Sequence, residues 1–378
     1  MTADVSSNQS PDAQVREGMP LFNDQVLKLG LFGTNCSGGL TMTEAETGYE
    51  VSWEHTRAIA KQADRMGFEA LVPIARWKGF GGATDFNGTN FDTYTWAAGL
   101  AAETENITLV STSHLPTTHP IVAAKASTTI DHISGGRFAL NLVMGWFTPE
   151  MEMFGAGQRG HDDRYRFGEE WIQIVRRLWS DDEPFDFDGE YLVVNQAISK
   201  PHPVQKPRPI LINAGNSPAG LDFSARNVDI NFAVVHSIDQ AHEYTRRVRD
   251  LARNRYSRDL SVMMSAFVIC RETEQEARNV RQAILDAGDY EGARNLAETL
   301  GIQSASFDTQ VKAGLDPFVL SFGAYTIVGN PEQVAEELIA LSNAGMDGVI
   351  IGFLDYVKEL EFFDRRVMPL LREAGVRK

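Results

Sequence analysis

Short apolar runs alternate with longer amphipathic stretches along almost the whole chain. A buried parallel strand is apolar over a few consecutive residues, so these runs predict eight strands. The predicted strands are Leu27–Gly33, Ala70–Ala75, Ile107–Thr112, Phe138–Val143, Pro209–Asn213, Asp229–Val235, Val262–Ile269 and Gly348–Phe353.

The stretches between the runs carry apolar residues near helical spacing. The predicted helices are Trp53–Met66, Tyr94–Glu103, Ile121–Ile130, Arg166–Trp179, Ser217–Arg226, Asp239–Asn254 and Pro331–Ala344. Strand–helix alternation implies parallel βαβ units, which build either a closed TIM (β/α)8 barrel or an open doubly wound sheet. No G-x-G-x-x-G motif follows the first strand, and this favours the barrel.

Two connections are longer than a minimal βα unit. They are Trp146–Lys206, after the fourth strand, and Asp289–Tyr325, after the seventh. Insertions on this side of a barrel usually cover or shape the active site. We therefore expect both segments to lie close to the functional residues.

Composition is that of one large α/β domain. Of the 378 residues, 43% are hydrophobic and 23% charged, which is enough to bury the core of a single barrel over 25–378. Residues 1–24 are rich in Ser, Gln, Asp and Asn and predict a flexible N-terminal leader. No long apolar run or signal peptide is apparent, so we expect a cytoplasmic protein.

Charge and cysteine content narrow the function classes further. The formal net charge of −16 argues against nucleic-acid and membrane partners and favours a small-molecule substrate. The two cysteines, Cys36 and Cys270, are far apart and have no CxxC or His-rich companion, so neither a disulfide framework nor a metal site is expected.

In a barrel the active site lies at the carboxyl ends of the strands, so the residues that follow each apolar run are the candidates. Ala75 and Arg76 follow the second run and lead into a Gly-rich loop that would suit either an anion or a flat ring, or be a solvated turn. Thr112 and His114 end the third. A lone histidine at such a position is more often structural than catalytic.

Asn141 lies among apolar neighbours in the fourth run. A buried amide needs hydrogen-bond partners, because an unsatisfied one costs about 1–3 kcal/mol, so Asn141 is either a backbone strut or a functional group. Downstream, Arg164 and Tyr165 fall at the start of an amphipathic helix. They would suit a phosphate or a ring edge, although a surface helix start would look similar.

Gly215 and Ser217 lie in a turn between the fifth run and an apolar helix with Pro218 in its first turn. Such a turn exposes backbone N–H groups to an anion, which is how barrels hold flavin phosphates. This pattern favours phosphate binding. No metal-ligand pattern, nucleophile elbow or Walker loop appears elsewhere in the sequence.

Read together, these segments resemble the flavin-dependent monooxygenases of the bacterial-luciferase-like family, in the branch of dimethyl-sulfone and pyrimidine monooxygenases. The resemblance covers nearly everything after Lys28. It rests on Asn35–Gly39, Gly79–Gly82, Thr129–Arg137, Asn141–Phe147, His161–Arg166, Ala214–Gly220, Phe223–Arg226 and Gly352–Pro369. The segments are specific together and weak singly.

The resemblance implies the oxygenase half of a two-component system. FMN, reduced by a separate NAD(P)H:FMN reductase, would react with O2 as cosubstrate, through a flavin N5-peroxide in the pyrimidine branch. Residues matching the oxygen pocket are Val72, Thr112, Asn141 and Trp146, with Thr112 and Asn141 as donors. Residues matching the FMN contacts are Ala75, Arg76, Asn141, Glu150, Arg164, Tyr165, Gly215 and Ser217.

Substrate and assembly follow less directly from the resemblance. We expect cleavage of a C–S, C–N or C–halogen bond in a small electron-poor substrate such as a sulfone, an N-heterocycle or a haloarene, and a homodimer or homotetramer. Pro73–Lys78 and His114–Thr118 differ from both relatives where substrate should bind. An F420-dependent hydride-transfer oxidoreductase and a non-catalytic flavin-binding protein are the alternative readings.

Overall fold

Parallel strands close into a barrel in the computed structural model, which describes residues 19–157, 159–300 and 309–378. The order around the ring is β1-β2-β3-β4-β7-β8-β9-β11, and β11 pairs with β1 to close it. The barrel strands are β1 (Lys28–Phe32), β2 (Ala70–Val72), β3 (Thr108–His114), β4 (Phe138–Val143), β7 (Ile210–Asn213), β8 (Ile230–Ala233), β9 (Ser261–Cys270) and β11 (Gly348–Gly352). All eight predicted strands are confirmed, and so is the TIM barrel.

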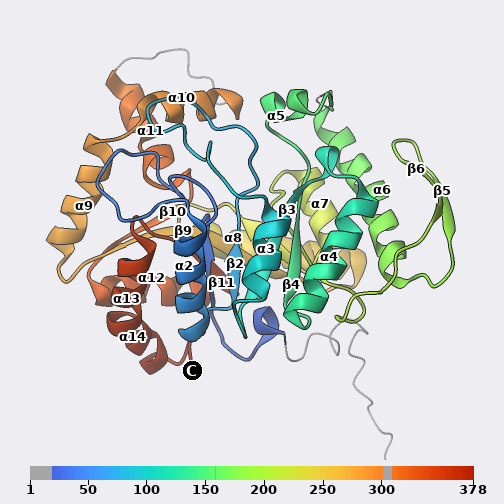
Figure 1. Ribbon diagram of the computed structural model, residues 1–378. Helices are drawn as coiled ribbons and strands as arrows, with labels where there is room; N and C mark the ends of the chain where they lie inside the picture. The colour runs from blue at the N-terminus through green and yellow to red at the C-terminus, as the bar shows by residue number, and fades with distance from the viewer. Residues whose placement is uncertain (1–18, 158, 301–308) are drawn as a thin grey trace, which may run out of the picture.

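Helices surround the barrel (Figure 1). They are α2 (Trp53–Arg65), α3 (Thr93–Ala101), α4 (Pro120–Ser134), α5 (Thr148–Met153), α6 (His161–Ser180), α7 (Pro218–Asn227), α8 (Ile238–Tyr256), α9 (Glu274–Asp286), α10 (Tyr290–Thr299), α11 (Thr309–Ser321), α12 (Pro331–Asn343), α13 (Tyr356–Arg366) and α14 (Met368–Glu373). Each of the seven predicted helices is present. Local signals start several of them, as where Ser52 accepts the His55 N–H to cap α2.

Apolar side chains from alternate positions of the strands fill the barrel interior. Val72, Val110, Ala139 and Met263 are buried in one interior cluster, which is a packed core and not a pore. Leu21 joins this cluster from η1, a 3-10 helix over Pro20–Phe22, and only 2% of its surface is exposed. Part of the predicted leader is therefore packed against the barrel, while its residues 1–18 lie outside the described residues.

The two predicted insertions lie over the carboxyl ends of the strands, around α5, α10 and α11 in Figure 1. The first also contains the antiparallel hairpin β5 (Phe185–Asp188) and β6 (Val193–Ala197), which projects to one side. The second ends in β10 (Tyr325–Gly329), a strand that the sequence analysis missed. β10 pairs outside the ring with Ala266–Cys270, the second half of the long strand β9.

The C-terminal end of the chain is anchored at the end of the barrel that lies opposite the carboxyl ends of the strands. Nη1 of Arg377 lies 2.7 Å from both carboxylate oxygens of Glu69, and both side chains are almost fully buried. Glu69 also accepts the Leu29 N–H at 2.7 Å, so the ion pair links the C-terminus to β1 and to the residue before β2. Among the described residues, no helix has the length and apolar character needed to cross a bilayer.

Candidate active site

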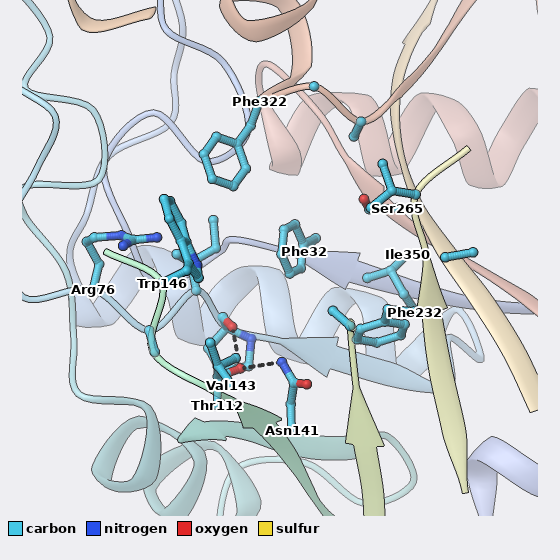
Figure 2. A pocket seen from close by; sticks show the side chains of 18 of the residues that line it. Phe32, Arg76, Thr112, Asn141, Val143, Trp146, Phe232, Ser265, Phe322 and Ile350 are labelled. Carbon is cyan, nitrogen blue, oxygen red and sulfur yellow. Dashed lines mark hydrogen bonds between the residues drawn. The ribbon is translucent and has the colours of Figure 1, made fainter. Parts of the chain in front are cut away.

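A cavity opens at the carboxyl ends of the barrel strands, where barrels hold a small molecule or a cofactor. Its walls are largely apolar and come from six barrel strands, from the loops that follow them and from the second insertion. In Figure 2, Thr112 and Asn141 lie at one side of the cavity, Phe232, Ser265 and Ile350 at another, and Phe322 opposite Thr112.

Thr112 and Asn141 form a polar pair on this apolar wall. They are register partners on β3 and β4, and Nδ2 of Asn141 donates to Oγ1 of Thr112 at 3.2 Å. The Thr112 hydroxyl donates in turn to the Pro73 carbonyl at 2.9 Å. Since its proton is used there, the hydroxyl accepts from Asn141, and this fixes the orientation of the amide.

These hydrogen bonds leave two polar groups of the Asn141 amide without a partner. Its Oδ1 is buried and accepts no hydrogen bond from the described part of the chain, and its second N–H is likewise unused. The resemblance implied two donors, but the Thr112 proton is already used by the backbone of Pro73. Asn141 is therefore the group of the pair that is free to bind a ligand.

Arg76 is held between aromatic rings beside the same cavity. Its guanidinium carbon lies 5.0 Å from the ring centre of Phe80, 5.1 Å from that of Trp146 and 5.3 Å from that of Phe147. Burial lowers the pKa of Arg76 from its usual value, and the nearby carboxylate of Glu150 opposes that shift. A buried planar cation among flat rings is suited to stacking on, or donating to, a further flat ring.

Glu150, on α5, is fully buried and organises the loop after β2. Its Oε1 accepts the Trp77 N–H at 2.6 Å and the Lys78 N–H at 3.3 Å, and lies 3.5 Å from Nη1 of Arg76. Its Oε2 lies 3.3 Å from Nδ1 of His114. Burial opposes ionisation, but the facing imidazole of His114 and the charge of Arg76 outweigh it, so the pKa of Glu150 is lowered.

A second group of predicted residues lies at the loop between β7 and α7. Ser217 caps α7 by accepting the Gly220 N–H at 3.1 Å, and Gly215 donates to Oδ1 of Asn213 at 2.9 Å. A Cβ atom built on Gly220 would lie 2.5 Å from the Tyr165 hydroxyl and 2.7 Å from Cα of Gly215. The two glycines therefore allow a close approach of Tyr165 and backbone that no larger residue permits.

Arg164 connects this region to the residues near Trp146. Its Nη1 donates to the Gly145 carbonyl at 3.1 Å, and its Nε is buried without an acceptor among the described residues. Gly145 has a φ of +77°, and a Cβ there would lie 2.8 Å from Pro116, so the tight turn before Trp146 requires glycine. Arg164 thus keeps an unused N–H group near the turn that places Trp146.

The remaining predicted residues divide between the cavity wall and the core. Ala75, Arg76 and Trp146 line the cavity with Thr112 and Asn141. Val72 does not line it and lies in the interior cluster, which also includes the cavity residue Ile350. Glu150, Arg164, Tyr165, Gly215 and Ser217 do not line the cavity themselves, and Ala214, which does, directly precedes Gly215.

Several cavity residues were not predicted. Ser265 lies in the middle of β9, and the register of that long strand is not readable from its apolar pattern. Phe322 comes from the second insertion with a φ of +54°, a strained conformation for a bulky residue. Asn213 does not line the cavity but supports the β7–α7 loop, where its Oδ1 accepts the Gly215 N–H, and its amide donates to the Leu142 carbonyl at 2.6 Å. The one feature of the sequence that could have pointed to Asn213 is an amide side chain at the end of a predicted strand.

The residues fit a flavin mononucleotide. The ring would find apolar walls, a buried and unpaired amide oxygen on Asn141 and a stacked guanidinium on Arg76. The phosphate would find the close-packed glycines of the β7–α7 loop and the unused Nε of Arg164. Within the described residues, no three His, Cys, Asp or Glu side chains group to hold a metal ion.

Comparisons with known proteins identify the family of this chain. The chain matches the family described as Luciferase-like monooxygenase over residues 27–348. It is 32% identical to the FMNH(2)-dependent dimethylsulfone monooxygenase of Pseudomonas putida over 359 residues, 92% of this chain and 96% of the relative. Pyrimidine monooxygenase RutA of Acinetobacter baylyi is 32% identical over 355 residues, 91% of this chain and 95% of the relative.

Among solved structures, DmoA from Hyphomicrobium sulfonivorans has a TM-score of 0.82 at 19% identity, covering 94% of this chain and 90% of that one. The chain belongs to the luciferase-like monooxygenase family. The predicted family, barrel fold and enzyme class, a flavin-dependent monooxygenase, are thereby confirmed.

Proposed function

We propose that this protein is the oxygenase component of a two-component monooxygenase that uses reduced FMN and O2 to oxidise a small electron-poor substrate. The observation that carries the proposal is the Thr112–Asn141 pair, a buried amide with unused hydrogen-bonding groups on an apolar cavity wall. Reduced FMN would supply the two electrons that one oxygen atom of O2 requires to leave as water.

The side chains of the cavity have separate tasks in this proposal. Asn141 would donate its free N–H to the developing negative charge beside the flavin edge, where a low dielectric strengthens the bond. Trp146, Phe32 and Val143 would exclude water from the same region. Val72 does not line this cavity, but from the interior cluster it would support the side of the oxygen pocket nearest the core.

The predicted FMN contacts fall into two sets. Ala75, Arg76 and Asn141 would hold the ring, and Glu150 would fix Arg76 and the backbone that carries it. Arg164, Tyr165, Gly215 and Ser217 would hold the phosphate. Ser217 lies at the N-terminus of α7, where the helix dipole and free N–H groups favour an anion.

Supply of the flavin requires a second protein. A separate NAD(P)H:FMN reductase would deliver FMNH2, and because NAD(P)H is a cytoplasmic reductant, the proposal places the enzyme in the cytoplasm. Assembly as a homodimer or homotetramer is part of the same proposal and is measurable by light scattering.

The relatives suggest the substrate class. One is named for a sulfone and another for a pyrimidine, both small and electron-poor. The unpaired amide of Asn141 and the buried cation of Arg76 suit a compact substrate with polar acceptors. Cleavage of a C–S, C–N or C–halogen bond is therefore the proposed outcome.

A component-omission assay tests the proposal. The protein is mixed with FMN, a flavin reductase, NADH and air, together with a panel of sulfones, pyrimidines, pyridines and haloarenes. One panel member should give an oxygenated product only when all components are present.

Anaerobic titrations with FMNH2 and with reduced F420 test the hydride-transfer alternative, because tight binding of F420 with no binding of FMNH2 would reject the monooxygenase. Binding of FMNH2 without any product would instead favour a flavin-binding protein.

A further inference from the structure

We propose that His114 is a catalytic residue that moves a proton at the substrate, with Glu150 as its positioning residue. The proposal rests on the monooxygenase function above and assigns a role to a side chain outside the predicted oxygen pocket and FMN contacts. Three observations carry it: the pairing of the imidazole with a buried carboxylate, the confinement of that carboxylate, and the position of the imidazole between two cavities.

His114 is the last residue of β3, two positions after Thr112, and only 5% of its surface is exposed. Its Nδ1 lies 3.3 Å from Oε2 of Glu150. Nδ1 of His114 and Oε2 of Glu150 face each other at ion-pair distance, but neither atom makes a hydrogen bond to any residue that the structure describes. No hydrogen bond joins Nε2 to a described residue either, and Nε2 is not fully buried, so this nitrogen is open to the cavity.

Glu150 has little freedom to pair in another way. Its Oε1 is occupied by the N–H groups of Trp77 and Lys78 and by the Arg76 guanidinium, which leaves Oε2 to face His114. A carboxylate beside Nδ1 favours the tautomer with a proton on Nδ1 and a lone pair on Nε2. The arrangement is that of a carboxylate–imidazole pair, the usual way to orient a general acid–base.

The imidazole also lies where two cavities meet. The barrel cavity and a second cavity of about 1120 Å³ share Ala75, Arg76, Thr112 and His114. The second cavity extends between the loop that precedes α3 and the start of α4. A substrate in either cavity that reached the Thr112–Asn141 pair would touch the residues around His114, which is the position a proton carrier needs.

The charged and titratable groups that face His114 come from three directions. Glu150 on α5 and Arg76 after β2 flank the ring on one side, and Asp92 and Tyr94 line the second cavity. Asp92 is exposed and already accepts the Thr95 N–H as the cap of α3. Of these groups, Glu150 is the one within ion-pair distance of the imidazole.

The proposed step follows oxygen transfer. Once a hydroxyl group has been placed on the carbon that carries the leaving group, Nε2 of His114 accepts the hydroxyl proton. The C–O bond becomes a carbonyl, the bond to sulfur, nitrogen or halogen breaks with its electron pair, and His114 returns the proton to the leaving group. One proton moves from oxygen to the leaving group, and no further oxidant or reductant is consumed.

Two substitutions separate a proton carrier from a structural histidine. His114→Asn keeps a polar amide near the position of Nδ1, and His114→Gln keeps one near Nε2, but neither transfers a proton. Both variants should lose about 10²-fold or more in kcat with FMNH2 affinity within about threefold of the wild type. His119→Asn is the matched control: His119 is exposed and caps α4 through Nδ1, and asparagine is an equivalent cap.

The tautomer of the resting imidazole gives a further readout. Nitrogen NMR of the protein without flavin should show the Nδ1–H tautomer, and Glu150→Gln should lose that preference.

The outcomes distinguish this proposal from the function it rests on. If His114→Asn turns over normally while the wild type gives product, or if the resting imidazole carries its proton on Nε2, His114 is not the proton carrier and the monooxygenase stands. If the wild type gives no oxygenated product from any substrate, the proposed function itself fails, and the catalytic role of His114 fails with it.

Discussion

Asn141 donates to Thr112 at 3.2 Å across two adjacent strands, and the Thr112 hydroxyl donates in turn to the carbonyl of Pro73. The two side chains thus form a chain of hydrogen bonds that runs from the Asn141 amide, which faces the cavity, to the backbone of Pro73. Asn141 therefore has its remaining N–H and its Oδ1 available, while Thr112 acts mainly to hold the amide in place.

Asn141→Ala should abolish most oxygenation and weaken flavin binding much less, because Ala75 and Arg76 would still hold the ring. Loss of one preorganised donor to a developing oxyanion typically lowers the rate by about 10²–10³-fold. Product formation and the anaerobic Kd for FMNH2 measure the two effects separately. Thr112→Ser is the matched control. Its serine hydroxyl can make the same two hydrogen bonds, so this variant should retain most of the rate. Normal turnover by Asn141→Ala with FMN bound would reject the assigned role of Asn141.

Gly220→Ala should weaken flavin binding, because its Cβ would lie 2.5 Å from the Tyr165 hydroxyl and 2.7 Å from Cα of Gly215. The clash forces Tyr165 and the β7–α7 turn apart, so we expect the Kd for FMNH2 to rise at least about tenfold, or 1.4 kcal/mol. Gly157→Ala is the control, since a Cβ there meets no atom within 4 Å. Equal affinities for the two variants would place the phosphate elsewhere.

Glu150→Gln should destabilise the protein in a pH-dependent way. The pKa of Glu150 is lower in the folded chain than its ordinary 4.5, so its ionised form contributes stability above that pH. This contribution is lost as the pH falls through the folded-state pKa. Urea unfolding should show a wild-type advantage of roughly 1–3 kcal/mol at pH 7 that narrows below about pH 4.5.

The exposed neighbour Glu152 on α5 provides the control for that experiment. Glu152→Gln removes the same charge without removing a buried contact, so it should change the free energy of unfolding by less than about 0.5 kcal/mol. An advantage of the wild type over Glu150→Gln that grew as the pH fell would contradict the assigned ionisation of Glu150.

Arg377→Ala should lower stability without changing the chemistry. It would leave the buried Glu69 carboxylate without its cation at the end of the barrel opposite the cavity, which typically costs about 3–5 kcal/mol. Chemical denaturation measures the loss, and kcat per folded molecule should equal that of the wild type. A change of less than about 1 kcal/mol would show that the ion pair does not anchor the C-terminus.

The barrel was predictable because its signals are local and repeated. The ring strands contain apolar runs, since parallel strands are buried on both faces, and β4 begins and ends at the predicted residues. β10 was missed because it is half-buried and pairs outside the ring, so its residues lack that apolar pattern. Leu21 was missed because one buried side chain in a polar segment leaves no periodic signal.

The site was predictable to the extent that strand ends and family motifs mark it. Thr112, Asn141, Ala75, Arg76 and Trp146 do line one cavity. The pairing of His114 with Glu150 was not predictable from pattern, because the two are 36 positions apart and meet only where α5 folds back over the end of β3. Phe322 depends likewise on the path of the second insertion.

Oxygen-isotope labelling shows whether this chain transfers an oxygen atom from O2 to its substrate. The complete system, with FMN, reductase and NADH, is supplied with ¹⁸O2 in ordinary water. The mass of the product formed from the panel member that is oxidised is then measured by mass spectrometry. We expect one ¹⁸O atom in each product molecule, and none when the flavin or the oxygenase is omitted. A product that carries only oxygen from water, or that forms equally well without O2, would contradict the assignment of this chain as a flavin-dependent monooxygenase.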